Sequence, residues 1–302
     1  MAVITTGAHP KALWPGIKEW WGRSYMEHQE EFPDLFDKET SDKAYEEEVE
    51  ITGFGLAPVK NQGTAINYDV ETQGSVTRYT HIAYALGYIV TWEEMRDDLY
   101  EVVSKRRAKM LAFSMRQTKE NNGANVYNRA FTAGYTGGDG VVMISASHPT
   151  LSGNQSNILT NAADLSEASI EDLTIQIMQA TNNRGLKISL MPQSLHVSPQ
   201  NWYEANRILK SVLQSDTANN NINVLKATGV FPKGIKMNHY FSSATAWFIR
   251  TNCPTGLVHF ERDAVMFDQD NDFDTKNAKA ACYERYSFGW SDWRGVWGTP
   301  GV

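Results

Sequence analysis

Cysteine is scarce in this sequence of 302 residues. Its two cysteines, Cys253 and Cys282, cannot build a disulfide framework, and they lack the paired spacing of a zinc site. So little cysteine is typical of a protein that folds in a reducing, intracellular compartment. Both side chains are therefore expected to behave as small buried hydrophobic groups.

Long apolar runs and an excess of positive charge are also missing. The most apolar stretch, residues 83–90, is far shorter than the ~18 residues that a membrane helix needs. Residues 1–13 lack the cationic start and apolar block of a secretory signal. Lys and Arg total 28 against 35 Asp and Glu, which gives a net charge of −7. Because tight phosphate binding needs clustered cations, a basic nucleic-acid clamp is not expected, and neither is membrane association.

The common catalytic motifs do not occur. The glycines of residues 134–140 are not followed by the Gly-Lys-Ser/Thr ending of a phosphate loop, so this stretch is interpreted as a flexible hinge. The seven histidines form no two-histidine helical motif, and Gly289-Trp290-Ser291 has the wrong continuation for a nucleophile elbow. No catalytic residue and no cofactor is therefore predicted, and the protein is not expected to be an enzyme.

One acidic segment has the residue types of a metal site. Carboxylates on alternate residues can converge on Ca²⁺ or Mg²⁺. They are Asp268, Asp270, Asp272 and Asp274. An EF-hand loop has Gly at its sixth position and Glu at its twelfth, where this chain has Phe273 and Lys279. We interpret the segment as a solvated turn between two strands, and metal binding there stays open.

Tryptophan, in contrast, is abundant. Six of the nine tryptophans lie near the two ends of the chain: Trp14, Trp20, Trp21, Trp290, Trp293 and Trp297. Terminal segments are normally polar and frayed, so ends this aromatic must be buried against their own domain or another subunit. This pattern is a first indication of assembly. Replacing Trp20 and Trp21 by Ala is expected to weaken assembly more than it lowers the melting temperature of the subunit.

The first 90 residues suggest two extended pieces. Residues 1–44 are interrupted by Pro10, Pro15 and Pro33, and they are interpreted as an arm. Residues 45–90 contain two strand-like stretches separated by a polar, turn-rich tip at about residues 56–74. An isolated two-stranded ribbon is barely stable in water, so this excursion is expected to need a partner surface.

A long helix is predicted next. Thr91 and Glu94 have the spacing of a capping box, and apolar residues follow at helical intervals. Acidic residues crowd the first turns and basic residues the second half, as the helix dipole favours. The pattern ends at Asn121-Asn122-Gly123, a C-cap signature. A helix over residues 91–120 would be about 45 Å long at ~1.5 Å per residue.

The remainder alternates short helices and strands before a β-rich return. Asp164 and Glu167 predict a capping box for a helix through Met178, and Ser198-Pro199 predicts the start of another. Strands are expected at residues 194–197, 246–251, 257–261 and 278–289. The fold class is therefore α+β, with no internal repeat.

This order of elements resembles the Hong Kong 97-type fold of tailed-bacteriophage major capsid proteins. Several segments are similar to those of Mu-like major head subunits. They are residues 91–129, Ser147-His148-Pro149, residues 197–209, residues 246–250 and residues 284–295. The resemblance implies an N-terminal arm (1–44), an extended β-loop (45–90), a peripheral domain (91–134 and 241–279) with a spine helix at 91–120, and an axial domain (135–240 and 280–302).

The resemblance also implies a function and partners. The chain would be a structural subunit that self-assembles through pentamers and hexamers into an icosahedral head, part of the virion, in the host bacterial cytoplasm. Its partners would be copies of itself, a portal and double-stranded DNA that it encloses without sequence-specific binding. Because the arm is short and begins at Met1, we expect either a separate scaffolding protein or a chain already in its mature form. A decoration protein, covalent crosslinking, the host and the shell size stay open.

Candidate contacts between subunits follow from the arm, the loop tip, the helix and the tryptophans near the C-terminus. They are Trp14, Trp20, Trp21, Pro58, Lys60, Asn61, Trp92, Arg106, Arg107, Trp290, Trp293 and Trp297. Two other functions stay open. One is an encapsulin-like shell of a bacterial compartment, which would enclose cargo enzymes in place of DNA. The other is a carbohydrate-active enzyme or binding module that uses tryptophan platforms and a carboxylate pair.

Overall fold

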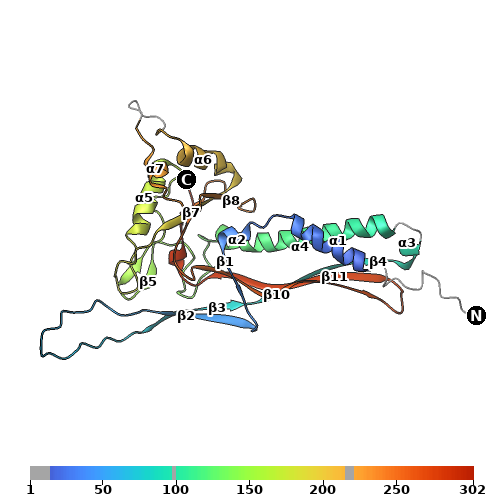
Figure 1. The fold of residues 1–302 in the computed structure, drawn as a ribbon, viewed down its shortest axis with the longest axis horizontal. Helices are drawn as coiled ribbons and strands as arrows, with labels where there is room; N and C mark the ends of the chain where they lie inside the picture. Colours follow the sequence, from blue (N-terminus) through green and yellow to red (C-terminus); the bar gives the residue numbers. More distant parts are fainter. Residues whose placement is uncertain (1–13, 97–99, 215–220) are drawn as a thin grey trace, which may run out of the picture.

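The computed structural model describes residues 14–96, 100–214 and 221–302. Figure 1 shows three parts: a long sheet with two helices lying along it, a compact domain at one end of that sheet, and a hairpin that projects away from the body. Within the described ranges, none of the helices has the length and apolar character to cross a membrane.

The long sheet has four strands in the order β1-β10-β11-β4. They are β1 (Asp37–Thr40), β10 (Leu257–Asn271), β11 (Ala278–Trp290) and β4 (Ile82–Val90). β1 runs parallel to β10, and the other pairs are antiparallel. Ala280, Cys282 and Tyr286 of β11 alternate with exposed or half-buried residues. This period of two gives the sheet one apolar face, and two helices cover it.

The spine helix, α4 (Tyr100–Asn128), lies on that face behind a short helix, α3 (Trp92–Arg96). The Thr91 hydroxyl accepts the amide of Glu94 as predicted, but the Glu94 carboxylate pairs with Arg107 and does not close the box. The helix also continues past the expected stop at residue 120. A Cβ on Gly123 would lie 3.3 Å from Phe32 and 3.4 Å from Phe288, so this glycine permits close packing and is not a C-cap. Residues 97–99 of the predicted helix lie outside the described ranges.

The expected arm is not free. Helix α1 (Trp14–Glu27) packs along α4, and a one-turn helix, α2 (Phe32–Leu35), follows it. Trp21 stacks on Tyr25 at 5.2 Å and on Phe267 of β10 at 5.3 Å. The buried aromatic side chains of α1 therefore pack against β10 of the same chain. Residues 1–13 of the expected arm lie outside the described ranges.

The compact domain is built on a second sheet, in the order β12-β9-β7-β8. Its strands are β7 (Pro192–Val197), β8 (Ile235–Met237), β9 (Trp247–Thr251) and β12 (Val296–Thr299). The domain also holds α5 (Glu167–Met178), α6 (Trp202–Lys210), α7 (Val224–Thr228), the short strands β5 (His148–Thr150) and β6 (Gly153–Gln155), and the 3-10 turns η3 (Pro199–Asn201) and η4 (Trp293–Gly295). Its core joins residues of α5 to both central strands, as Ile170, Leu195 and Trp247 illustrate. The expected strand at residues 194–197 and the helix start at Ser198-Pro199 are present as β7, η3 and α6. The α5 capping box is formed by Ser166 and Ser169 and not by Asp164 and Glu167.

Sheet pairing moves three boundaries relative to the sequence-based division. β4, expected in the extended loop, pairs with β11 from Ala278↔Val90 to Tyr286↔Ile82. β11, which falls mostly within the expected axial segment 280–302, is a central strand of the long sheet, whereas β9, expected in the peripheral domain, is central in the compact sheet. In each case the strand belongs to the sheet with which its backbone pairs.

The hairpin consists of β2 (Tyr45–Ile51) and β3 (Gln73–Thr80), paired antiparallel from Tyr45↔Thr80. Residues 52–72 form its tip and belong to no strand. The two strand-like stretches expected in this region form a hairpin over residues 45–80, which ends where the chain turns into β4.

Candidate assembly surfaces

The hairpin tip is an exposed apolar surface. Leu56, Val59, Ile66 and Tyr68 are 81%, 92%, 64% and 89% exposed, respectively. Pro58, Lys60 and Asn61 are exposed between them. A surface of apolar side chains that no described part of the chain covers marks a site of contact with another molecule.

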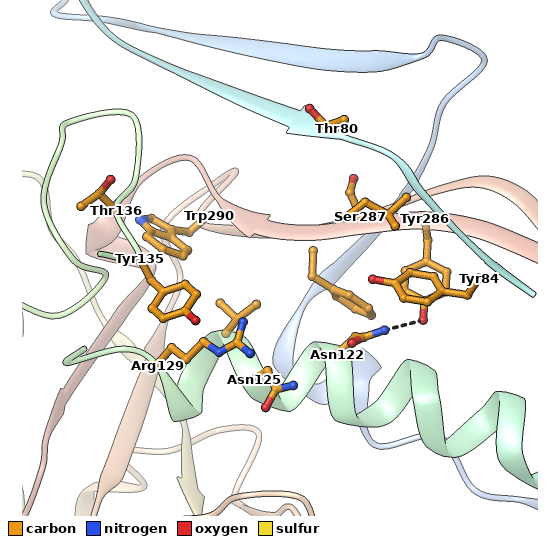
Figure 2. Close-up of a pocket in the computed structure, with 13 residues that line it drawn as sticks. Thr80, Tyr84, Asn122, Asn125, Arg129, Tyr135, Thr136, Tyr286, Ser287 and Trp290 are labelled. Carbon is orange, nitrogen blue, oxygen red and sulfur yellow. Dashed lines mark hydrogen bonds between the residues drawn. The ribbon is translucent and has the colours of Figure 1, made fainter. Parts of the chain in front are cut away.

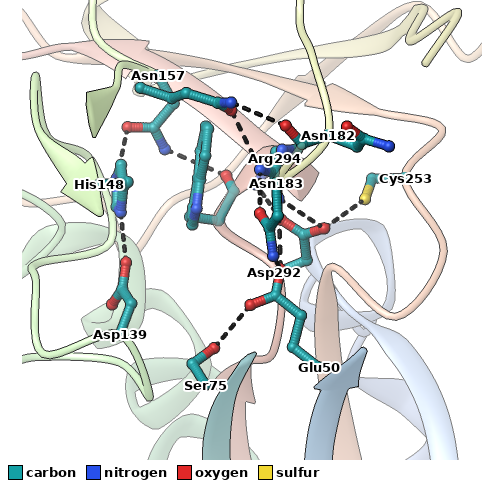
Figure 3. A network of polar contacts seen from close by, with 12 residues as sticks. Glu50, Ser75, Asp139, His148, Asn157, Asn182, Asn183, Cys253, Asp292 and Arg294 are labelled. Atoms are coloured by element: carbon teal, nitrogen blue, oxygen red, sulfur yellow. Dashed lines mark hydrogen bonds and ion pairs between the residues drawn. The ribbon is translucent and has the colours of Figure 1, made fainter. Parts of the chain in front are cut away.

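The root of the hairpin is held by a polar cluster, which we call the root clasp: the half-buried Glu50, Ser75 and Asn183 and the buried Arg294 (Figure 3). Asn183 and Ser75 donate hydrogen bonds to the two Glu50 carboxylate oxygens at 2.7 and 3.0 Å. The Arg294 guanidinium, only 3% exposed, lies 3.6 Å from Glu50 and also pairs with Asp292 at 3.2 Å. Sequence reasoning missed this cluster because its members are isolated polar residues far apart in the chain.

A second contact holds the hairpin farther out. Arg184, in the turn after α5, donates to the Asp69 carboxylate at 2.6 Å, and the amide of Gly55 donates to the same oxygen at 2.7 Å. The backbone amides of Gly55 and Val70, followed by Arg184, hold the pKa of Asp69 below its usual value. The hairpin is therefore tied to the compact domain at its root through Glu50 and again within the tip through Asp69.

The glycine-rich turn at residues 134–140 packs against the hairpin and is not a hinge. A Cβ on Gly138 would lie 2.5 Å from the Thr77 hydroxyl oxygen and 2.7 Å from the Val76 carbonyl oxygen. A Cβ on Gly137 would lie 2.6 Å from the Trp290 indole nitrogen. These glycines let the turn come close to β3, so the prediction of a flexible hinge is wrong.

A buried histidine network ties this turn to the C-terminal strands (Figure 3). His148 is fully buried, with Asp139 at 2.6 Å on one ring nitrogen and Asn157 at 3.0 Å on the other, and its ring stacks on Trp293 at 4.4 Å. The Asn157 amide donates to the Val296 carbonyl at 3.0 Å. The arrangement fixes loops and presents no side chain to a substrate.

A second polar pair has the residue types of a catalytic dyad. The Ser194 hydroxyl lies 2.8 Å from Nε2 of His196, but both residues are buried on β7. Burial, followed by nearby cations, lowers the pKa of His196 to about 3. Burial also raises the pKa of the Cys282 thiol to about 12, and Cys253 is half-buried beside Asp292. Ser194, His196 and Cys282 are buried in the packing and have no access to the solvent that a reaction would use.

Several aromatic and basic contact candidates are occupied within the chain. Trp21, Trp293 and Trp297 are 5%, 7% and 3% exposed, so they leave no surface for a neighbour, and the expectation that they contact other subunits is wrong. Arg107 is engaged with Glu94 at 2.7 Å, whereas Arg106 is exposed. Trp92 and Trp290 are half-buried. The side chains of Trp14 and Trp20 lie outside the described residues.

Asp272 and Asp274 lie at the apex of the hairpin between β10 and β11, as the sequence predicts, whereas Asp268 and Asp270 lie on β10 itself. Asp272 pairs with Lys279 at 2.9 Å, and this bond is the main reason that its pKa lies below the usual value. Phe273 is 94% exposed at the apex. Among the residues that the structure describes, no group of three or more His, Cys, Asp or Glu is arranged to hold a metal ion.

A groove of about 340 Å³ lies beside the start of β4, between the strands and the end of α4 (Figure 2). Asn122 and Asn125 extend from α4 toward the groove, Arg129 extends from the turn just after α4, and Tyr84 lines the groove from β4. Arg129 lies over the ring of Tyr135 at 4.5 Å and is the only charged residue among those that line the groove. A further exposed apolar surface lies on the compact domain, over α6, α7 and the segment that joins them. Its exposed side chains are Tyr203, Val212, Ile222 and Val224.

A sequence comparison decides the family. The family described as "Phage capsid protein" matches residues 74–298, which run from β3 to β12 and include the spine helix and every strand of both sheets except β1. The chain belongs to this family of phage capsid proteins. The resemblance that the sequence carries is thereby confirmed, and with it the structural role of a capsid protein.

Solved structures share the fold of this capsid protein at low sequence identity. The capsid of the cyanophage P-SCSP1u is 11% identical, with a TM-score of 0.55 over 90% of this chain and 88% of that one. The structure from Mycobacterium phage Che8 is 12% identical, with a TM-score of 0.52 over 91% and 93%. A virus-like particle from Pyrococcus furiosus is 8% identical, with a TM-score of 0.50 over 95% and 99%. No curated protein matches the sequence significantly. The α+β capsid fold expected from the sequence is therefore confirmed.

Proposed function

We propose that this capsid protein is the major subunit of a phage head and that it assembles through pentamers and hexamers into an icosahedral shell around double-stranded DNA. The observation that carries the proposal is the hairpin tip, where Leu56, Val59 and Tyr68 are exposed on an excursion that has no core of its own. Exposing these apolar side chains to water is unfavourable in free energy, and a neighbouring subunit that covers the tip would bury them. A closed shell provides that neighbour for every copy.

Each part of the fold has a role in the proposed shell. The hairpin, residues 45–80, overlaps a neighbour through its tip, where Pro58, Lys60 and Asn61 are contact residues. The long sheet with α4 forms the peripheral domain, and the compact domain is the axial domain, which meets its copies around the five-fold and six-fold axes through Tyr203 and the apolar side chains beside it. Arg106, on the exposed side of α4, is a further contact candidate.

The proposed partners follow from charge and assembly. A net charge of −7 keeps the wall from adhering to the genome, so DNA is enclosed without sequence-specific binding. A separate scaffolding protein guides assembly in the bacterial cytoplasm, and a portal occupies one vertex of the finished virion.

Deleting residues 56–63 tests the proposed role of the tip. The root clasp and the Arg184–Asp69 contact lie outside the deletion, so the subunit is expected to fold with an unchanged melting temperature. Assembly, followed by light scattering and negative-stain microscopy, should fall at least about tenfold, because each contact loses several buried apolar side chains. The matched control is Phe273→Ser, which removes an exposed apolar side chain at the opposite end of the long sheet. Normal particles from the deletion variant would refute the role of the tip.

The second candidate function is the shell of a bacterial compartment. The observation that favours this function is the fold that the chain shares with the virus-like particle from Pyrococcus furiosus. The two functions differ in content. Native mass spectrometry of purified particles should detect double-stranded DNA in a phage head, whereas cargo protein in its place would support the compartment. The family match gives no support to the carbohydrate-active alternative.

A further inference from the structure

The helix pair on the long sheet has an outer side that points away from the sheet (Figure 1). On this side of α4, four side chains are exposed: Arg106, Lys109, Met110 and Phe113. Because they are spaced three and four residues apart, they lie together on one face of the helix. We call this set the α4 stripe.

The apolar part of the α4 stripe is unusual for a solvent-facing helix. Met110 is 64% and Phe113 is 42% exposed, whereas Leu111 between them is buried against α1. Helix α1 adds Met26, which is 79% exposed, and the ring of His28 contacts that of Phe113 at 4.7 Å. A single exposed apolar residue is ordinary, but several on adjoining helices mark a surface for another protein, where Met and aromatic residues are enriched.

The charged part of the α4 stripe has only one sign. Residues 102–119 contain no Asp or Glu, so neither Arg106 nor Lys109 has a carboxylate at a neighbouring position on its own helix. Arg107 pairs with Glu94 at 2.7 Å, but no ion pair between described residues engages Arg106 or Lys109. In a chain with a net charge of −7, this stripe therefore offers two cations to the carboxylates of a partner.

An acidic amphipathic helix matches both parts of the surface. Such a helix lays its apolar face on a hydrophobic surface of its partner, and its charged flanks pair with opposite charges there. Double-stranded DNA would use the cations alone, because its phosphates have no apolar side to cover Met110 and Phe113. The combination of cations with exposed Met and Phe favours the helix.

We propose that the α4 stripe, together with Met26 of α1, binds an acidic amphipathic helix of a second protein. The apolar side chains of that helix cover Met110 and Phe113, and its carboxylates pair with Arg106 and Lys109. This inference goes beyond the proposed shell, because it assigns a surface of the single subunit to a different protein.

A designed peptide tests the surface on unassembled subunits of the full chain. The peptide has about 18 residues, because shorter helices are marginal in water, with Leu on one helical face and Glu on the other. Fluorescence anisotropy of its fluorescein label measures binding. The unaltered protein should bind it at least about tenfold more tightly than a scrambled peptide of the same composition, which lacks the apolar face.

Substitutions locate the binding surface. Met110→Ser and Phe113→Ser should each weaken binding at least about fivefold by removing apolar contact. Arg106→Glu/Lys109→Glu should weaken it at least about tenfold, because two attractions become repulsions. The matched control is Lys60→Glu, a charge reversal on the hairpin tip, which should change affinity by less than about twofold. Circular dichroism checks that each variant is folded, and Met110→Ser decides the apolar arm if the loss of the His28 contact unfolds Phe113→Ser.

Several outcomes would overturn the inference. They are absence of peptide binding, equal binding of the scrambled peptide, and binding that none of the stripe variants weakens. Preferential binding of a double-stranded DNA oligonucleotide through Arg106 and Lys109 would assign the surface to nucleic acid. Self-association of the peptide-free protein that Met110→Ser abolishes would assign it to a second copy. Particle formation is scored separately, so failure of the proposed shell leaves the peptide result standing, and the reverse also holds.

Discussion

The long sheet with its covering helices α1 and α4, which together we call the spine, and the hairpin contain strands with the same alternating pattern, but the outcome is opposite. In β11, Ala280 and Cys282 alternate with outward-facing residues and are buried under α1 and α4. In β2, Val49 and Ile51 alternate in the same way but are exposed. The difference is the helical layer, which covers the long sheet but, in the part of the chain that the structure describes, does not extend over the hairpin.

The comparison shows how one chain combines a stable body with a surface that needs a partner. The spine is stabilised by apolar burial and by buried ion pairs between helix and sheet. The hairpin is positioned by polar contacts at its root, and its apolar side chains are left for another molecule. Substitutions should therefore lower the stability of the unassembled subunit in the spine, and they should change mainly order and assembly in the hairpin.

The largest effect is expected from the buried ion pair of the spine. Lys119 is 3.2 Å from the Glu284 carboxylate, and both are almost fully buried. Burial raises the pKa of Glu284, which Lys119 counteracts. Lys119→Met leaves an uncompensated buried carboxylate, so the free energy of unfolding in urea should fall by about 3–5 kcal/mol. The double variant Lys119→Met/Glu284→Gln should recover most of the loss.

A surface pair in the hairpin provides the contrast. Arg78 and Glu47 face each other at 3.7 Å, and both are largely exposed. Arg78→Met should change the free energy of unfolding by less than about 1 kcal/mol. Equal losses from Lys119→Met and Arg78→Met would contradict the distinction between the two regions.

A pH-dependent effect of up to about 3 kcal/mol is expected where the N-terminal segment joins the spine. Glu120 is buried on α4 and accepts the amides of Glu31 and Phe32 at 3.0 and 2.9 Å. Burial outweighs these two hydrogen bonds and raises the pKa of Glu120 to about 7 from its usual 4.5. The folded protein therefore binds more protons than the unfolded chain between these two values, and stability falls as pH rises through them.

Glu120→Gln removes this titration. From pH 4.5 to 7, the unfolding free energy of the wild type should fall relative to that of the variant, and the difference should level off above about pH 7. Chemical denaturation across this range measures it, and the other titrating groups cancel because both proteins contain them. A difference that does not change with pH would show that Glu120 keeps an ordinary pKa.

The packed glycine turn should give a smaller effect, at the boundary between the two regions. Gly138→Ala places a methyl group against backbone and side-chain atoms of β3, so the turn must shift, at a cost of about 1–3 kcal/mol. The control is Gly22→Ala in α1, where a Cβ meets nothing within 4 Å. Ala also has a higher helix propensity than Gly. That variant should be more stable by up to about 1 kcal/mol, as measured by thermal unfolding. A neutral Gly138→Ala would mean that the turn is the hinge expected from its composition.

Local signals in the sequence predict much of this fold. The charge gradient and apolar spacing predict α4, and Ser198-Pro199 predicts the turn into α6, because both depend on residues close in the chain. The end of α4 is not predictable from Asn121-Asn122-Gly123, since the reason for Gly123 is its contact with Phe288 on β11. The pairing of β4 with β11 likewise depends on long-range register.

The candidate surfaces show the same division between features that depend on residues close in the chain and features that depend on long-range contacts. The polar, turn-rich composition around Pro58 predicts an exposed tip, and the structure places it there. Tryptophan content predicts burial but not the partner, so Trp21 and Trp297 are buried within their own chain and not between subunits. The Arg294–Glu50 contact leaves no local signal, because two charges so far apart in sequence meet only after the compact domain and hairpin have folded.

The smallest effect on stability is expected at the outer contact of the hairpin. Arg184 and Asp69 are partly exposed, so Arg184→Ala should lower the free energy of unfolding by less than about 1 kcal/mol. The same substitution removes the cation that holds the second arm, and amides of residues 52–72 should exchange faster with solvent, while those of α4 stay unchanged. Arg184→Lys keeps the charge but loses the second guanidinium contact, to the Val70 carbonyl, so its exchange should be intermediate. If Arg184→Ala left exchange in residues 52–72 unaltered, the root clasp alone would position the hairpin.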